Sequence, residues 1–346
     1  MVLMAIDHVR VYSGVPAGGP TYGVFFTRWV THFCAPSFVF FAGTAAFLHG
    51  RKLDNRAALS KYLVTRGLML VVLELTLIKL AWTFSADYSG FILAGVIWML
   101  GWCMVLLSGL IWLPTRVIAI LGIALIAGQQ FLGGLSEFIY PSGEEIETRI
   151  TILYTIVPWI GVMAAGYSFG AILERDEAAR TKWWVRIGVA MTLVFIVVAA
   201  VQASSNTGEN ASPWLIRFLS QRKYPASPLF LMMTLGPAIA LLPIAGRARG
   251  WLADVFVTFG RVPMFYYLMH IPLIHALSMI VWKIRDGSTH AAAMATAPYV
   301  QFGPGVHWSL GLLYLVFVIV VFLLYWPSKW FADLKSRRRD AWLSYL

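Results

Sequence analysis

Long runs of apolar residues, each about the length of a membrane-spanning helix, dominate the chain. A helix needs about 20 mostly apolar residues to cross about 30 Å of hydrocarbon. The runs lack the alternation of apolar and polar positions typical of barrel strands, so they predict helices. We expect nine full spans, at residues 29–49, 62–83, 90–112, 116–135, 151–173, 184–203, 228–246, 252–282 and 307–327.

Residues 1–12 form a tenth apolar segment that is too short to cross a bilayer. A Gly- and Pro-containing loop at 13–23 follows it, so we interpret 1–12 as a half-span and expect the natural chain to begin earlier. It lacks the basic leader and cleavage pattern of a signal peptide. The predicted fold class is all-α: a polytopic transmembrane bundle of about ten helices, the first truncated, in a single domain spanning 1–346.

Composition agrees with this prediction. Of the 346 residues, 59% are hydrophobic and 12% are charged, whereas a soluble domain carries about 25% charged residues. This excludes a cytosolic enzyme, a disordered chain and a nucleic-acid binder, and makes the lipid bilayer a partner. Cys34 and Cys103 both lie in apolar runs, so no disulfide framework is indicated.

The net charge of +11 reflects how basic residues are divided between the loops. Of the 27 Lys and Arg residues, 17 fall in one alternating set of loops and seven in the other. Because cytoplasmic loops carry the excess of Lys and Arg, the first set and the tail at 335–339 are expected in the cytoplasm. The predicted location is the inner (plasma) membrane, with several passes and a cytoplasmic C-terminus.

Ionisable side chains inside spans cost several kcal/mol unless they are paired or solvated, so each is a candidate functional residue. From helix rise, we expect these groups to form a column between the two faces if their helices face one another. They are Asp7, His8, Arg10, Arg28, His32, Glu74, Lys79, Arg261, His270 and His275.

Each candidate also has a structural interpretation. Arg10 can pair with Asp7 at i,i+3, and Arg28 and Lys79 can extend to lipid headgroups. Glu74 can form a structural ion pair with one basic neighbour. A histidine in a membrane span is more often a hydrogen-bonded contact between helices than a catalyst. Three histidines and two carboxylates in the outer half of one bundle nevertheless exceed what packing requires.

Prolines adjoin two of the histidines. Pro36 removes the donor that would bond to the carbonyl of His32. Pro263 and Pro272 loosen the helix around His270, and broken helix is tolerated where backbone lines a cavity. We therefore expect a water-accessible cavity beside this helix. The chain has no Walker loop, GxGxxG, HExxH or CxxC motif.

Several stretches resemble bacterial relatives of heparan-α-glucosaminide N-acetyltransferase, within a wider group of transmembrane acyltransferases. They are MAIDHVR at 4–10, FTRWVTHFCAPSFVFFAGT at 26–44, KYPAS at 223–227, LGP at 235–237, FGRVP at 259–263 and YLMHIP at 267–272. The resemblance implies acyl transfer from cytoplasmic acyl-CoA to a sugar amine or hydroxyl reached from the other face. Family positions that hold an Asn, a loop His and an Asp fall here on Asp7, Tyr22 and His32.

The leading hypothesis is a membrane acetyltransferase that uses acetyl-CoA as acyl donor and a glycan or amino sugar as acceptor. A histidine, His32 first and His8 second, acts as general base. Asp7 orients it, as carboxylates do in hydrolase triads, and His270 completes the catalytic set. Direct transfer and an acetyl-histidine intermediate both remain open.

Other residues are expected to bind substrates. Arg261 is the candidate for a CoA phosphate, because a guanidinium binds phosphate oxygens in a bidentate fork; capping of carbonyls at a helix break is the alternative. Lys223 and Tyr224 are expected at the acceptor entrance, and Arg28 and Glu74 in the acceptor site. No metal site is expected.

Two other functions remain open at this point. A transporter or flippase for a polar or lipid-linked solute also suits ionisable groups and broken helices, although no matching pair of interrupted helices is found in the two halves. An inactive assembly partner is the third interpretation. Oligomeric state stays open, a homo-oligomer included.

Overall fold

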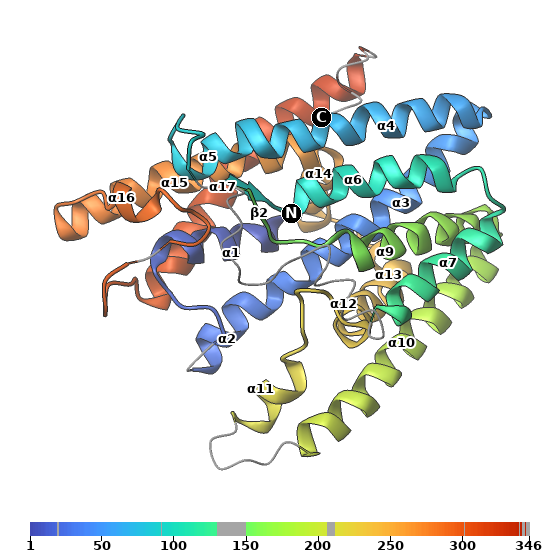
Figure 1. Cartoon of the computed structure of the whole chain (residues 1–346), viewed down its shortest axis with the longest axis horizontal. Coiled ribbons are helices and arrows are strands. Elements are labelled where there is room, and N and C mark those ends of the chain that lie inside the picture. Colours follow the sequence, from blue (N-terminus) through green and yellow to red (C-terminus); the bar gives the residue numbers. More distant parts are fainter. Residues whose placement is uncertain are drawn as a thin grey trace. The chain divides into compact units, whose positions relative to one another are not determined.

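The computed structural model describes residues 1–18, 21–90, 92–129, 150–205, 212–300 and 302–338, together with Asp340 and Leu343. Regular structure in these ranges is almost entirely helical, which confirms the all-α prediction (Figure 1). The chain divides into two compact units. One comprises Met1–Cys34, Thr76–Ser89 and Ala248–Leu346, and the other Ala35–Leu75 and Gly90–Arg247.

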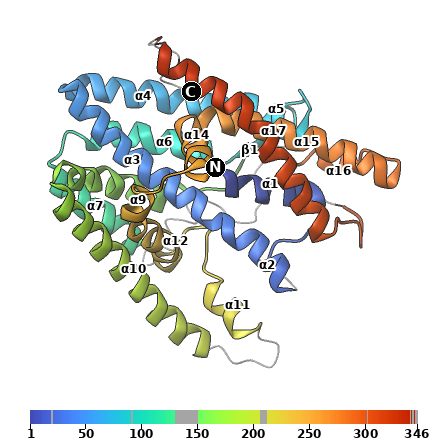
Figure 2. The ribbon, with the colours of Figure 1, turned by 180° about the vertical axis from the view of Figure 1, so that it is seen from behind.

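The first unit is built around the short N-terminal helix α1. Its elements are α1 (Val2–Ser13), α2 (Tyr22–Trp29), the 3₁₀ turn η1 (Val30–Phe33), α5 (Lys79–Thr83), α14 (Trp251–Arg261), α15 (Pro263–Asp286), α16 (Ala291–Met294) and α17 (Leu310–Arg337). Helix α1 packs against α2, α15 and α17, and α5 packs against α15 (Figures 1 and 2). Burial of Ala5, Val9 and Tyr12 on α1 places the half-span inside this unit.

The second unit consists mainly of antiparallel helix pairs. Its elements are α3 (Cys34–Leu53), α4 (Arg56–Leu73), β1 (Ile92–Ala94), α6 (Val96–Leu110), α7 (Thr115–Gly128), β2 (Ile150–Ile152), α9 (Ile156–Phe169), the 3₁₀ turn η3 (Gly170–Glu174), α10 (Glu177–Ser205), α11 (Trp214–Leu219), α12 (Pro228–Ala240) and α13 (Leu242–Ala245). The closest pairs are α4 with α6, α7 with α9, and α10 with α12. Strands β1 and β2 pair in parallel, with Ile92 opposite Ile150. The π-helical turn η2 (Glu74–Ile78) continues the chain from α4 to α5.

Six helical segments are long and apolar enough to cross a membrane: Tyr22–Leu53, Ile156–Glu174, Glu177–Ser205, Pro228–Ala245, Pro263–Asp286 and Leu310–Arg337. Helices α6 and α7 are apolar but shorter. The protein is therefore an integral membrane protein. The expected count of ten helices and the expected single domain both stay predictions.

The apolar run at 252–282 forms two helices where one was expected. Helix α14 ends at Arg261, Val262 adopts φ −130° and ψ 52°, and α15 begins at Pro263. The cause is local, because Pro263 lacks the N–H that would continue α14 and restricts the residue before it. Pro272 lies inside α15 without ending it.

Candidate active site

Helix α1 presents the first polar residues of the site and then stops abruptly. Gly14 adopts a left-handed φ of 73° just after the helix, and a Cβ there would lie 2.5 Å from the carbonyl oxygen of Val306. Only glycine fits such a position without strain. The Ser13 hydroxyl donates to the carbonyl oxygen of Arg10 at 2.7 Å, and the N–H of Val15 donates to the Ser13 hydroxyl at 3.2 Å. The end of α1 is thus held in one conformation.

The most unusual contact in this unit joins two histidines. Nδ1 of His8 on α1 lies 2.6 Å from Nε2 of His270 on α15. The two rings are nearly parallel, with centroids 4.8 Å apart. His270 is fully buried, whereas His8 is half-buried. The sequence places both residues in the catalytic set, and the structure brings them together.

The surroundings of His270 fix which nitrogen carries each proton. Nδ1 of His270 lies 2.7 Å from the carbonyl oxygen of Tyr267 and 3.1 Å from that of Tyr266. Carbonyl oxygens only accept, so Nδ1 of His270 is the protonated nitrogen and Nε2 of the neutral ring is an acceptor. His8 must then donate from its Nδ1. In the neutral form of His8, Nε2 is then the nitrogen that carries the lone pair of a general base.

Aromatic side chains surround the histidine pair. The His8 ring meets Trp82 edge-on at 4.7 Å and Tyr267 at 6.5 Å. The Tyr266 ring stacks on His270 at 5.3 Å, and its buried hydroxyl forms no hydrogen bond within the described part of the chain. None of these three aromatics is among the site residues predicted from the sequence. The only signal was that Tyr266 lies four residues before His270, on the same face of a helix.

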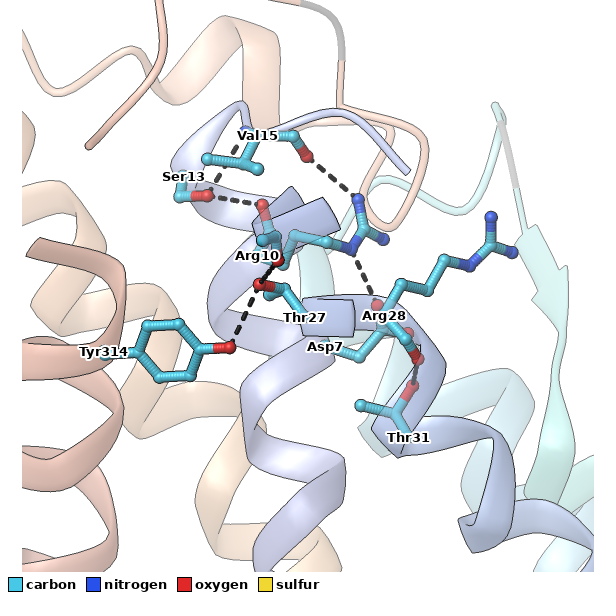
Figure 3. A network of polar contacts seen from close by, with 9 residues as sticks. Asp7, Arg10, Ser13, Val15, Thr27, Arg28, Thr31 and Tyr314 are labelled. Carbon is cyan, nitrogen blue, oxygen red and sulfur yellow. Dashed lines mark hydrogen bonds and ion pairs between the residues drawn. The ribbon is translucent and has the colours of Figure 1, made fainter. Parts of the chain in front are cut away.

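Asp7 pairs with Arg10, as one of the structural interpretations of the sequence allowed. Nε of Arg10 donates to Oδ1 of Asp7 at 2.8 Å, and Nη1 donates to the carbonyl oxygen of Val15 at 3.0 Å (Figure 3). Asp7 and His8 are adjacent on α1, so their side chains point about 100° apart. His8 is hydrogen-bonded to His270, and orientation of the base by Asp7 stays a prediction.

A third histidine on α15 has different neighbours. His275 is buried, with its ring stacked between Phe84 at 3.9 Å and Tyr12 at 4.8 Å. Its Nδ1 lies 3.4 Å from the carbonyl oxygen of Ala81. His270 and His275 therefore belong to separate clusters, as expected from a five-residue separation.

His32 and Arg28 lie in the same unit, on the segment that follows the first loop. His32 is in the 3₁₀ turn η1 and half-buried, and Arg28 is in the last turn of α2. Arg261 ends α14 immediately before the break and is exposed. Lys79, buried on α5, donates to the carbonyl oxygens of Ser85 and Asp87, so it closes the loop after its helix.

Three candidates lie in the second unit, where they have local partners. Oε2 of Glu74 accepts from the N–H groups of Ile97 at 2.8 Å and Trp98 at 3.1 Å, which caps the N-terminus of α6. Lys223 lies over the ring of Tyr224 at 5.3 Å, and the Tyr224 hydroxyl donates to that of Tyr154 at 3.3 Å. No group of three or more His, Cys, Asp or Glu side chains in the described residues could hold a metal ion.

Fold and site together define a class: an integral membrane helical protein with a hydrogen-bonded pair of histidines, one of them fully buried. The catalytic domain of heparan-alpha-glucosaminide N-acetyltransferase matches residues 1–200, which is more than half of the chain. The protein belongs to this family and is a membrane acetyltransferase. No curated protein matches the chain. His8 and His32 lie within the matched residues, and Arg261 and His270 follow them.

Proposed function

We propose that the protein transfers an acetyl group from acetyl-CoA to the amine or hydroxyl group of a sugar. The observation that carries this proposal is the hydrogen bond between His8 and His270, which leaves Nε2 of His8 as a base on a half-buried ring. Membership of an acetyltransferase family supports the reaction class.

The chemistry follows from the proton positions. Nε2 of His8 takes a proton from the acceptor as its nitrogen or oxygen attacks the thioester carbonyl. The tetrahedral intermediate then expels the thiolate of CoA, and His8 returns the proton to that sulfur. His270 contributes by accepting from Nδ1 of His8 throughout, which fixes the ring and stabilises its charged form. General-base help of this kind supplies about 10²- to 10⁴-fold.

His32 is retained as the alternative base. It shares the first unit with the histidine pair, and the sequence argument placed it first. What favours His8 is that its partner, His270, is itself anchored by two backbone carbonyls. A base oriented by a second fixed group is the arrangement of known catalytic dyads and triads.

Donor and acceptor are proposed to enter from opposite faces of the inner membrane, with the C-terminus cytoplasmic. Arg261 is proposed to bind a CoA phosphate, because it is exposed at the end of α14, two residues before the start of the helix that carries His270. Seven residues of α15 separate Pro263 from His270, a rise of about 10 Å, which the pantetheine arm of CoA can span. Arg28, Lys223 and Tyr224 stay proposals for the acceptor side, whereas the two N–H groups that Glu74 accepts favour a structural role for this carboxylate.

The proposal is tested with purified protein in detergent. We expect equilibrium binding of acetyl-CoA and thiol release that rises when glucosamine is added. His8→Gln should bind acetyl-CoA with unchanged Kd but release no thiol. His32→Gln should still release thiol. Absence of acyl-CoA binding in the wild-type protein would overturn the proposal, and CoA-independent solute uptake by reconstituted vesicles would support a transporter instead.

A further inference from the structure

Two arginines, Arg10 on α1 and Arg28 on α2, lie near the carboxylate of Asp7, the residue before His8 (Figure 3). Arg10 is 12% exposed in its side chain and pairs with Asp7, which is 23% exposed. Arg28 on the neighbouring helix α2 is half-buried. Figure 3 shows its side chain extending beside the Asp7–Arg10 pair, with no contact drawn to its guanidinium.

The guanidinium of Arg28 forms no hydrogen bond or ion pair with any described residue. The one contact of Arg28 in this network is through its backbone, whose carbonyl oxygen accepts from the Thr31 hydroxyl at 2.7 Å. A half-buried charge without a partner is costly, because it loses part of its hydration and no hydrogen bond or ion pair offsets that loss. An anionic group bound from outside the chain would remove that cost.

Hydroxyl groups on both sides of Arg28 hydrogen-bond to the backbone of its helix and to α17. The Thr27 hydroxyl donates to the carbonyl oxygen of Gly23 at 2.7 Å and lies 3.1 Å from the hydroxyl of Tyr314 on α17. Thr31 closes the following turn. Because this backbone is ordered before a ligand binds, less entropy is lost on binding, as in other preformed sites.

The position of these charges relative to His8 defines what they could bind. Asp7 precedes His8 by one residue and Arg10 follows it by two, so the two side chains leave α1 about 100° and about 160° around the helix from His8. An anion held here would lie to one side of the reacting atom, not on it. Carboxylate and phosphate oxygens both fit the fork of a guanidinium.

We propose that Arg28, supported by Arg10, binds an anionic group of the acceptor, a phosphate or a carboxylate carried near the amine or hydroxyl that is acetylated. This inference rests on the proposed acetyl transfer, and it narrows the class of acceptor to acidic sugars. Arg10 contributes positive charge and its remaining N–H donors, while Asp7 holds it in place.

The test compares acceptors that differ in charge. Acetyl transfer is measured to glucosamine, glucosamine 6-phosphate and muramic acid by wild-type protein, Arg28→Gln and Arg28→Lys. We expect Arg28→Gln to raise KM for the two acidic acceptors about 10- to 100-fold, the loss of a charged hydrogen bond. KM for glucosamine should stay within about twofold, and Arg28→Lys should recover part of the loss, because it keeps the charge without the fork.

A matched control removes the same charge elsewhere. Arg285 is exposed near the end of α15, and Arg285→Gln should leave all three KM values unchanged. Equal changes in KM for acidic and neutral acceptors in Arg28→Gln would overturn the inference.

A binding measurement separates this inference from the reaction itself. Glucosamine 6-phosphate should bind wild-type protein more tightly than glucosamine does, and Arg28→Gln should abolish the difference, whether or not turnover is seen. If acetyl-CoA binding and transfer fail while this difference holds, the proposed function falls and the anion site stands. Competition by phosphatidylglycerol added to the micelles would identify a lipid headgroup as the bound anion and overturn the acceptor assignment.

Discussion

His8 and His270 depend on each other for hydrogen bonding. His270 is fully buried and uses Nδ1 on backbone carbonyls, so its Nε2 needs the donor that His8 supplies. A buried polar atom that loses its partner costs about 1–3 kcal/mol. Replacing either histidine therefore removes the pair as a unit.

This predicts that the effects of the two substitutions on kcat are strongly non-additive. His8→Gln and His270→Gln should each lower kcat by about 10²- to 10⁴-fold, and the double variant should be no slower than the worse single one, as in catalytic groups that act together. His275→Gln is the matched control, since His275 is equally buried but stacks on Tyr12 and Phe84. Its kcat should fall far less than that of either single variant of the pair, because its ring packs in a separate cluster. Multiplicative losses in the double variant would contradict the pairing.

Glu74 gives a second test, because its carboxylate has a structural partner. It accepts two N–H groups at the start of α6, where a negative charge is favoured by the helix dipole. Glu74→Gln should destabilise the protein by about 1–3 kcal/mol without changing acceptor KM, measured by thermal unfolding and by steady-state kinetics. Glu174→Gln, at an exposed ion pair with Arg51, should cost about 0–1 kcal/mol. A raised acceptor KM with unchanged thermal stability in Glu74→Gln would contradict this structural role and support a place for Glu74 in the acceptor site.

Sequence predicted local partners better than distant ones. The i,i+3 spacing allowed the pairing of Asp7 with Arg10, which is observed. His8 and His270 are 262 positions apart, and no periodicity on α1 or α15 specifies which helices meet. The anchoring of His270 by carbonyls and the surrounding aromatics likewise depend on how the helices pack.

Helix pairs in the second unit approach closely where glycines face backbone. A Cβ on Gly166 of α9 would lie 1.9 Å from the carbonyl oxygen of Phe40 on α3, and one on Gly43 would lie 2.1 Å from that of Met163. Small residues allow such contacts in membranes, where packing replaces the hydrophobic effect as the force between helices.

Gly166→Ala should therefore force the two helices apart. We expect a loss of about 1–3 kcal/mol, as for other overpacked cores, seen as a lower Tm in detergent. Gly109 on α6 has no atom within 4 Å of its Cβ position, so Gly109→Ala should be neutral or stabilising. Equal Tm values for both variants would contradict the packing described.

Helix boundaries could be predicted where the sequence contains a specific cause. Pro263 indicated the break that divides α14 from α15, although the apolar run through it predicted one span. Apolar length alone did not fix the ends of α6, which is shorter than the run at 90–112 that contains it, and the end of the run at 116–135 lies outside the described residues. The π-helical turn at Glu74–Ile78 has no sequence signature.

For the protein as a whole, the distribution of basic residues predicts its orientation. Seventeen Lys and Arg residues lie in one set of loops, and lipid insertion favours that set in the cytoplasm. The exposed Ser336 near the end of α17 belongs to the set expected in the cytoplasm, and the exposed Ser288 belongs to the opposite set.

Single cysteines test this orientation. In a background with Cys34→Ser and Cys103→Ser, an impermeant maleimide applied to intact cells should label Ser288→Cys and spare Ser336→Cys until the membrane is opened. The reverse labelling pattern would show the opposite orientation, with the proposed acyl-CoA side outside the cell.

The central claim is that His8, held by His270, moves an acetyl group from acetyl-CoA to a sugar. The most direct measurement follows the label of [acetyl-¹⁴C]acetyl-CoA into glucosamine and glucosamine 6-phosphate with protein reconstituted in nanodiscs. Label should appear on the sugar with wild-type protein and with His275→Gln, and should be absent with His8→Gln that still binds acetyl-CoA. Undiminished transfer by His8→Gln would contradict the account.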